Sequence, residues 1–397
     1  MAIHVSEDII LEEILSRLPV KSILRFRSVC RAWLKKIDSP EFVQQQLCCS
    51  ASLSCRNGTG PLLFERRNFE IQNFTLPLLR CDTLLVEKEV KIPLGLAVRT
   101  PFNRISVIGS CNGLVAISVI PLKLSDMDWL VIWNPATKHY SELPKPSIST
   151  RELLYYGFVY LSSENDYKII RLVSPGLWGV LEGDISIKME VYSMKLDSWR
   201  KLDTKVAMVH IGYGMRHDIC IGQLIQSPGV NVNGVLHWIF FGTVSILSFD
   251  MVNEVFNVIQ IPNAFSLPFV NKNKLGGAQV RILELNGFLA IASAISSTST
   301  VTTAALIDIW VMREFGNFES WSKYMSFEVP EEICSHSFNL GSWIKGQVIL
   351  FGCKDNVMLF EPSSSTKSIK YVECRSIRYI KGGCNYYETL IPVGRRF

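Results

Sequence analysis

The side chains best suited to chemistry lie in one short stretch near the middle of the chain. His210, His217 and Cys220 are the kinds of residue that bind zinc. Their spacing matches no zinc-binding pattern, and a site would need a fourth ligand. A loop that contains two histidines is therefore the simpler interpretation, and the sequence predicts neither a metal site nor a cofactor.

Sequence motifs of catalysis and nucleotide binding are absent. The chain contains no GxGxxG, no GxxxxGK[ST], no GxSxG and no HExxH. His237 lies inside the apolar run VLHWI, where a satisfied core histidine is expected. Asn134, Asp197 and Asp250 recur where a strand meets a turn, which is typical of side chains that bond the local backbone. We therefore expect a protein that is not an enzyme.

Composition predicts a globular protein. The 397 residues are 48% hydrophobic and 19% charged, which allows a sizeable core and excludes global disorder. The formal net charge is only +5 and is not gathered into runs, so nucleic-acid binding is disfavoured. The eleven cysteines form no CxxC pair. Together with an acidic N-terminus, they predict free thiols in a reducing compartment, the cytoplasm or nucleus.

One uncharged stretch, residues 285–307, is long enough to span a bilayer. Eight of its 23 residues are Ser or Thr, however, and Asn286-Gly287 opens it. The stretch is therefore interpreted as strand, loop and strand, and no membrane span is expected.

The first fifty residues predict three or four short helices. Ile10, Leu11, Ile14, Leu15 and Leu18 form an apolar stripe at helical spacing. Ser6 is placed to cap that helix, and Pro19 ends it. A second helix follows with Ile23, Leu24 and Phe26 as its apolar residues.

Ser28 is placed to cap a third helix, which contains Val29, Cys30, Trp33 and Ile37. Pro40 then begins a fourth helix that ends near Leu47. So few residues cannot bury this much apolar surface among themselves. The helices either pack on the main domain as a cap, or they form a docking module whose apolar face a partner completes.

The stretch SEDIILEEILSRLPVKSILRFRSVCRAW resembles an F-box, especially the plant form. Val5-Ser6 stand where that family usually has Leu-Pro. The resemblance implies binding to a Skp1-type adaptor and, through it, to a cullin ubiquitin ligase. The stripe and the resemblance together give these candidate adaptor-binding residues, among which the module's own core residues are not distinguished: Val5, Ile10, Leu11, Ile14, Leu15, Leu18, Pro19, Ile23, Leu24, Val29, Cys30 and Trp33.

The rest of the chain contains a repeated pattern of strand, aromatic residue, turn and second aromatic residue. The second aromatic follows the first by seven residues in each of three copies: Trp133 and Tyr140, Tyr192 and Trp199, Phe249 and Phe256. Looser copies place Trp310 and Phe360 at the first position. These side chains are expected to form a core between repeats rather than a ligand cage.

A second element is a glycine that opens an apolar strand, as in SCNGLVAI (110–117) and ELNGFLAIA (284–292). Asn-Gly is a strong signal for a tight turn. Each repeat therefore predicts one small antiparallel sheet, which must stack on its neighbours to bury its faces. The spacing favours a six-bladed β-propeller-like fold, with the C-terminal strand closing the first blade; a β-sandwich is the alternative.

This region also resembles the F-box-associated domain, which is often called F-box/kelch-repeat. Matching stretches include VIWNPATKHYSELP and FDMVNEVFNVIQIP. The only Gly-Gly pairs are 276–277 and 382–383, so the likeness to kelch repeats is loose. The expected organisation is an F-box at 1–48, a linker at 49–60 and a β-propeller-like domain at 61–397.

A target is expected to bind on irregular loops held by the β scaffold. The candidate segments are 121–129, 174–188, 204–227, 263–279 and 294–303. The residues singled out within them are Trp129, Leu177, Trp178, Met208, Tyr213 and Arg216.

These observations predict a substrate-recognition subunit of a Skp1-cullin-F-box (SCF) ubiquitin ligase, which binds an unidentified target protein. Two other classes remain. A propeller can be a stand-alone module for a glycan or small ligand, or it can be a hydrolase. No paired carboxylates or histidine group recur at one blade position, which disfavours the enzyme.

Overall fold

In the computed structural model, the described part of the chain comprises nineteen ranges. They are residues 13–57, 62–66, 75–79, 86–92, 102–121, 129–148, 153–174, 183–185, 188–202, 209–211, 228–240, 245–262, 279–296, 304–330, 339–342, 348–351, 356–360, 369–373 and 380–394.

Helices occupy the N-terminal end of the chain. Their bounds are η2 Leu15–Arg17, α2 Val20–Phe26, α3 Arg31–Ile37 and α4 Pro40–Asn57. A further short helix, η4 (Phe318–Ser320), lies within the β region. The expected first helical turns and their Ser6 cap lie outside the described residues.

Two helix boundaries differ from the sequence prediction. Cys30, not Ser28, caps α3, because its Sγ accepts a hydrogen bond from the backbone N–H of Trp33. Helix α4 begins at Pro40 as predicted but continues to Asn57, through most of the segment assigned as a linker. No Gly or Pro interrupts residues 41–57, and Leu47 is buried against the β region, so the helix continues.

The β region forms six four-stranded sheets and one two-stranded sheet within the described residues. We call the four-stranded sheets blades 1 to 6. Blade 1 comprises β1 Leu62–Arg66, β2 Thr75–Leu79, β3 Val86–Lys91 and β26 Ile380–Asn385. Blade 2 comprises β4 Phe102–Cys111, β5 Leu114–Pro121, β6 Trp129–Asn134 and β7 His139–Glu142. Blade 3 comprises β8 Leu153–Leu161, β9 Asp166–Ser174, β11 Lys188–Ser193 and β12 Ser198–Lys201.

Blades 4 to 6 have the same four-stranded order. Blade 4 comprises β14 Val230–Val232, β15 Val235–Phe240, β16 Ser245–Asp250 and β17 Val255–Gln260. Blade 5 comprises β18 Gln279–Leu285, β19 Phe288–Ser296, β20 Ala304–Met312 and β21 Trp321–Pro330. Blade 6 comprises β22 Asn339–Ser342, β23 Val348–Phe351, β24 Asn356–Phe360 and β25 Ile369–Glu373. The two-stranded sheet pairs β10 (Gly183–Ile185) with β13 (Val209–Ile211).

The six blades close into a ring. One edge strand of each blade contacts the edge strand of the next blade, in the order β26, β4, β8, β14, β18, β22 and back to β26. The ring closes because β26, from the C-terminal end, pairs with β1 near the start of the β region. This confirms the predicted propeller and the predicted closing strand, and it leaves no place for the β-sandwich.

The seven-residue spacing of the aromatic residues follows from strand register. Each pair lies directly opposite across the hairpin between the third and fourth strands of its blade: Trp133–Tyr140, Tyr192–Trp199 and Phe249–Phe256. The first member of each pair is buried, whereas the second is partly buried or exposed. The first members therefore form core, and the second members line its edge.

The first and second strands of three blades are joined by the predicted Asn-Gly turns. In these turns both residues have positive φ: Asn112-Gly113, Asn233-Gly234 and Asn286-Gly287. Positive φ at both central positions is the requirement of the type I′ turn, which matches the twist of the flanking strands. The sequence prediction counted the strand after the glycine as the first strand of each sheet. In the structure, each of these blades has one more strand before the Asn-Gly turn, and this added strand is the innermost strand of the blade.

The stretch 285–307 contains β19 and β20, with residues 297–303 outside the described part. They pair antiparallel, so the predicted strands are confirmed. The helices that the structure describes include none long and apolar enough to cross a membrane.

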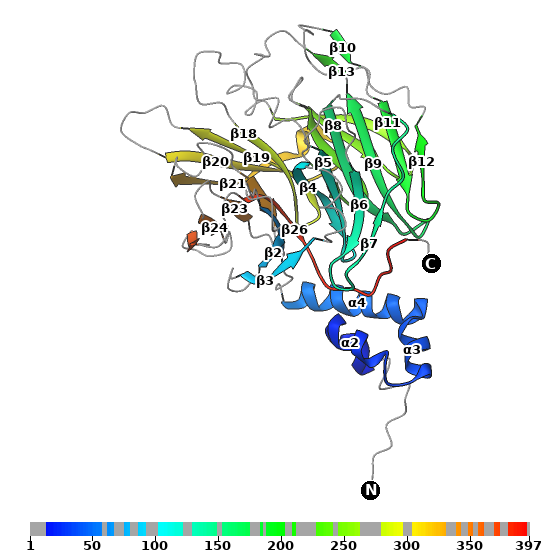
Figure 1. The fold of residues 1–397 in the computed structure, drawn as a ribbon. Coiled ribbons are helices and arrows are strands. Elements are labelled where there is room, and N and C mark those ends of the chain that lie inside the picture. The colour runs from blue at the N-terminus through cyan, green and yellow to red at the C-terminus, as the bar shows by residue number, and fades with distance from the viewer. Residues whose placement is uncertain are drawn as a thin grey trace.

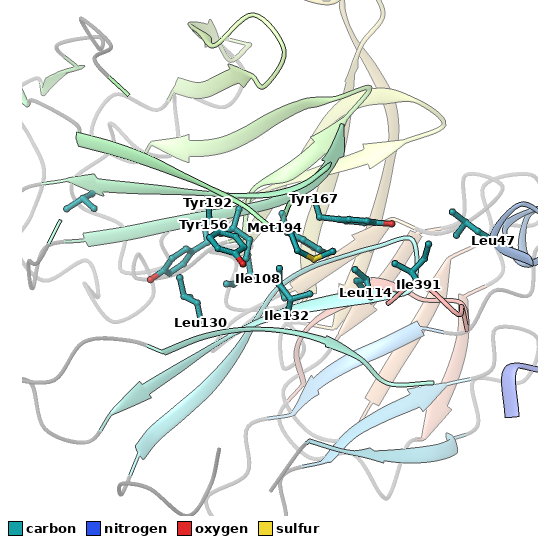
Figure 2. Close-up of a cluster of buried hydrophobic side chains, with 14 residues drawn as sticks. Leu47, Ile108, Leu114, Leu130, Ile132, Tyr156, Tyr167, Tyr192, Met194 and Ile391 are labelled. Atoms are coloured by element: carbon teal, nitrogen blue, oxygen red, sulfur yellow. The ribbon is translucent and has the colours of Figure 1, made fainter. Parts of the chain in front are cut away.

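Apolar side chains fill the spaces between neighbouring blades. Figure 2 shows the cluster between blades 2 and 3, where Ile132 of β6 faces Tyr156 of β8 and Tyr192 of β11. Leu47 of α4 and Ile391, beyond β26, complete one end of this cluster. The core of the propeller is thus continuous with the helices below it (Figure 1).

Candidate functional sites

The helical module has a filled core, to which one residue from the C-terminal end, Leu390, contributes. The side chains of Leu15, Val20, Ile23, Ile37 and Phe42 are buried together in one cluster. Leu18, Leu24 and Trp33 are partly buried against it. These positions hold the module together. Of the three described residues of the predicted stripe, Leu15 is buried, Leu18 is partly buried and Ile14 is exposed.

A second set of apolar residues stays at the surface of the module. Ile14 is 50% exposed and Val29 is 59% exposed, and Leu34 is also exposed. Pro19 and Cys30 are exposed as well. Since apolar side chains of this size gain free energy by leaving water, a group of them on a small module is typical of a docking surface.

The structure therefore divides the twelve predicted adaptor-binding residues. Ile14, Pro19, Val29 and Cys30 are available at the surface, Leu15 and Ile23 are buried, and Leu18, Leu24 and Trp33 lie between these extremes. Val5, Ile10 and Leu11 lie outside the described residues. Leu34 is an exposed apolar residue that the sequence prediction missed; its place next to Trp33, one turn after Cys30, was the available signal.

The helical module is also rich in basic side chains. Between Glu13 and Asp38, Lys and Arg outnumber Asp and Glu by seven to two. Both acids form surface ion pairs, Glu13 with Arg17 and Asp38 with Arg27. Lys21, Arg25, Arg31 and Lys35 remain exposed. The surface therefore suits a partner with an acidic face, which favours both the rate and the orientation of docking.

The strand ends that flank the five candidate target-binding segments lie at one end of the propeller. Each segment joins either the second and third strands of a blade or two successive blades. In antiparallel sheets, such connections leave from the end opposite the Asn-Gly turns. The Asn-Gly turn at Asn112 contacts the segment that packs on α4. The strand ends that flank the candidate segments thus lie away from the helical module.

The ribbon of β10 and β13 joins two of these segments. Asp184 of β10 pairs with His210 of β13, so the segments 174–188 and 204–227 meet there. Figure 1 shows the ribbon at the end of the propeller opposite the helices. Trp129 is half-buried at the start of β6, at this same end. Leu177, Trp178, Met208, Tyr213 and Arg216 lie outside the described residues.

The buried carboxylate of Glu190 is held by structural contacts. Glu190 of β11 accepts hydrogen bonds from Arg171 at 2.5 Å, from Ser147 N and Oγ at 3.0 and 2.8 Å, and from Ile148 N at 3.2 Å. It thereby fixes the connection between blades 2 and 3. Every one of these bonds is internal, which is typical of a structural carboxylate rather than a catalytic one.

Burial also suppresses the reactivity of a thiol. Desolvation raises the pKa of Cys111 to about 11, so the thiol stays protonated at neutral pH. Within the described residues no three His, Cys, Asp or Glu side chains are grouped so as to hold a metal ion. His210 lies in β13, and His217 and Cys220 lie outside the described part.

Two of the three repeat residues, Asn134 and Asp250, form the predicted turn contacts. Asn134 Oδ1 accepts from the backbone N–H groups of Ala136 and Thr137. Asp250 Oδ1 accepts from the equivalent groups of Val252 and Asn253. Asp197 occupies a different place in its turn, with φ of 52°. None of these contacts requires a ligand.

Two family models match different parts of the chain. The family described as "F-box associated beta propeller domain" matches residues 69–393, and the family described as "F-box domain" matches residues 8–45. "F-box protein CPR1" of Arabidopsis thaliana is 25% identical over 343 residues, covering 83% of this chain and 74% of that protein. "F-box/kelch-repeat protein At3g23880" of the same plant is 25% identical over 394 residues, covering 96% and 94%.

Solved structures with a similar course of the chain are more distant. A lectin from Aleuria aurantia covers 81% of this chain and 89% of its own, with a TM-score of 0.35 and 10% identity. AofleA from Arthrobotrys oligospora covers 75% and 82%, with a TM-score of 0.39 and 9% identity.

Proposed function

Because the chain belongs to the F-box proteins with an F-box-associated β-propeller domain, we propose that it is the substrate-recognition subunit of an SCF ubiquitin ligase. In this role the helical module binds a Skp1-type adaptor, which connects it to a cullin. The propeller binds a target protein, and the chain itself makes and breaks no bond. Catalysis follows from holding the target near a ubiquitin-charged E2 enzyme.

One observation supports this role most directly. Ile14 and Val29 stay exposed although the helical module already has a filled core. No core cluster among the described residues includes either side chain, whereas their exposure would supply the apolar centre of an interface. The exposed basic residues of the same module complement an acidic adaptor surface.

The long-loop end of the propeller is the proposed target-binding face. It lies at the opposite end from the helical module, so adaptor and target do not compete for space (Figure 1). Trp129 and the segments joined by the β10–β13 ribbon lie there. A subunit with this role works in the cytoplasm or nucleus, and the free thiols of Cys30, Cys48, Cys49, Cys111 and Cys384 accord with a reducing compartment.

The test is adaptor binding by an Ile14→Glu variant. A glutamate at this exposed position leaves the module's core intact but places an unpaired charge inside the proposed interface. We expect a loss of about 3 kcal/mol in binding free energy, or roughly a hundredfold in Kd, measured by calorimetry with a purified Skp1-type adaptor.

Val252→Glu is the matched control, since Val252 is 59% exposed on a turn of blade 4. The control should bind like the native chain, and both variants should keep the native melting temperature. Leu15→Glu is not a substitute for Ile14→Glu: Leu15 is 3% exposed, so the charge would disrupt the module itself. Unchanged affinity in Ile14→Glu would place the adaptor elsewhere, and a native chain that binds no adaptor would refute the proposed role.

A further inference from the structure

The chain continues beyond the closing strand as Tyr386–Gly394, which we call the C-terminal segment. It contains no helix or strand, yet Tyr386, Thr389, Leu390 and Ile391 are buried. In Figure 1 it is the red trace that passes between α4 and the propeller. A buried segment without regular structure needs hydrogen-bond partners from elsewhere for its backbone.

Helix α4 supplies partners on one side. Gln46 is a buried residue of α4, and its Oε1 accepts from the backbone N–H of Leu390 at 3.1 Å. Its Nε2 donates to the backbone carbonyl of Glu388 at 3.3 Å. The side chain of Leu390 enters the core of the helical module beside Leu15 and Phe42. The module's core is therefore completed by residues from the opposite end of the chain.

Blade 2 supplies partners on the other side. Asn134 Nδ2 donates to the carbonyls of Thr389 and Ile391, at 3.0 and 2.8 Å. Thr389 Oγ1 donates to the carbonyl of Asn112 at 2.9 Å, and the Tyr387 hydroxyl donates to Asn112 Oδ1 at 3.1 Å. Two turns of one blade thus hold the segment against the propeller.

The contact between Asn134 and the C-terminal segment differs from the turn hydrogen bonds that equivalent residues form in other blades. Asn134, Ser193 and Asp250 occupy equivalent positions, and each accepts backbone N–H bonds within its own turn through a side-chain oxygen. A hydroxyl or carboxylate is sufficient for that bond. The amide of Asn134 has two additional donor hydrogens, and both reach the C-terminal segment.

Gly113 is a second residue of blade 2 that is suited to contact with the C-terminal segment. A Cβ placed there would lie 2.5 Å from the carbonyl oxygen of Tyr387 and 2.6 Å from Thr389 Oγ1. At the equivalent Gly234 and Gly287 a Cβ would meet nothing within 4 Å. The turn of blade 2 therefore differs from its counterparts because it accepts this segment.

We propose that the C-terminal segment fixes the orientation of the helical module relative to the propeller, with Gln46 and Asn134 as positioning residues. The segment is bonded to both bodies at once, so it opposes rotation of α4 over blade 2. For a ligase subunit, this orientation sets where a bound target lies relative to the adaptor. That consequence rests on the proposed function, whereas the orientation itself does not.

Asn134→Asp tests the proposal with a minimal change. Aspartate keeps the oxygen that accepts from Ala136 and Thr137, as Asp250 does in its own turn. It removes both donors and places a carboxylate against two carbonyl oxygens. Asp250→Asn is the matched control, because it makes the reverse exchange at an equivalent turn that does not contact the segment. Gln46→Glu removes the donor to the Glu388 carbonyl from the helical side.

The measurement is a distance distribution in the full chain. Spin labels on ketone-bearing residues, introduced at the exposed positions Lys35 of α3 and Lys201 of β12, leave the cysteines unchanged. We expect one narrow distribution for the native chain and for Asp250→Asn, and a broadened or shifted one for Asn134→Asp and Gln46→Glu. A native-like narrow distribution in both Asn134→Asp and Gln46→Glu would overturn the proposal.

A second readout separates this proposal from the proposed function. Adaptor affinity should be unchanged in Asn134→Asp, because Ile14 and Val29 are untouched. In a ligase reconstituted with adaptor, cullin, E2 and ubiquitin, the native chain should modify a restricted set of its own propeller lysines, and Asn134→Asp should modify a wider set. An identical set in both would overturn the functional consequence. If the native chain binds no adaptor, the proposed function fails, and the distance distributions alone decide the orientation.

Discussion

At the scale of single residues, burial determines which groups can change charge. His237 is fully buried in β15, and its Nδ1 lies 3.2 Å from the Val230 carbonyl. The other ring nitrogen has no partner among the described residues, and the ring packs edge-on against Phe315. The core histidine predicted from sequence is thus confirmed, but only one nitrogen is satisfied. Desolvation lowers the pKa of His237 to about 4, so the ring is neutral at pH 7.

This histidine predicts acid sensitivity. Its folded pKa lies below the unfolded value of 6.5, so the unfolded chain binds the proton more tightly. The stabilisation is complete above about pH 6.5 and is lost as the pH falls toward 4. Between pH 7.5 and pH 5 the loss is about 2 kcal/mol, since each pH unit contributes about 1.4 kcal/mol per proton.

His237→Asn should remove this part of the pH dependence. We expect a smaller drop in unfolding free energy between pH 7.5 and pH 5 than in the native chain, measured by denaturant titration at both values. His139→Asn, at an exposed position of β7, is the control and should behave like the native chain. An undiminished drop in His237→Asn would assign the acid sensitivity to other groups.

At the scale of elements, β26 and the C-terminal segment have separable tasks although they are adjacent in sequence. Strand β26 pairs with β1 along its length, from Leu62↔Asn385 to Arg66↔Ile380, and closes the ring. The C-terminal segment bonds α4 and blade 2. Helix α4 is likewise more than a connection, because Leu47 packs between blades 2 and 3.

Two truncations separate these tasks. Deletion of residues 387–397 keeps Tyr386, which packs in one cluster with Leu63 of β1. It removes Leu390 and Ile391 from their clusters, with an expected loss of about 3–6 kcal/mol, and should speed amide hydrogen exchange in α4 while β1 stays protected. Deletion of residues 380–397 should also expose the edge of β1, so exchange there rises and the protein tends to aggregate. Exchange measured by mass spectrometry distinguishes them; equal protection of β1 in both would refute the closing role of β26.

At the scale of the whole molecule, the helical module is a part of the propeller's structure rather than an independent appendage. Its core includes Leu390 and contacts Ala136 of a blade 2 turn. The ring, in turn, is complete only when β26 has paired with β1. Both parts therefore depend on contacts between the two ends of the chain.

This dependence predicts that the helical module melts together with the propeller. The fragment 1–57 lacks Leu390 and Ala136, and so short a chain has little core to spare. By circular dichroism we expect it to melt at a lower temperature and less cooperatively than the helices do in the full chain, which should unfold in one calorimetric transition. A fragment that melts as sharply and as high as the full chain would contradict this coupling.

Local patterns in the sequence were sufficient to predict the propeller architecture. The seven-residue aromatic spacing corresponds to directly opposed positions of one hairpin, as at Trp133 and Tyr140, and Asn-Gly at 112–113 specifies a tight turn. Both are interactions between residues close in sequence, so periodicity reveals them. Repetition then implied stacked blades, and the unpaired C-terminal run implied the closing strand.

Contacts between residues far apart in the sequence determine which apolar residues of the helical module are buried, and the sequence pattern does not reveal them. The stripe at 10–18 does not show that Leu15 is internal and Ile14 external, because that depends on how η2, α2 and α4 pack. The sequence also does not show that Gln46 contacts Leu390, 344 residues away, or that Asn134 bonds the C-terminal segment in addition to its own turn. Sequence alone determined the helices of the module and the repeated blades, which follow from local geometry, and its resemblance to known sequences indicated the family. Only the tertiary structure determined which apolar residues face solvent and what holds the two domains together, because burial depends on residues that the chain brings together from its two ends.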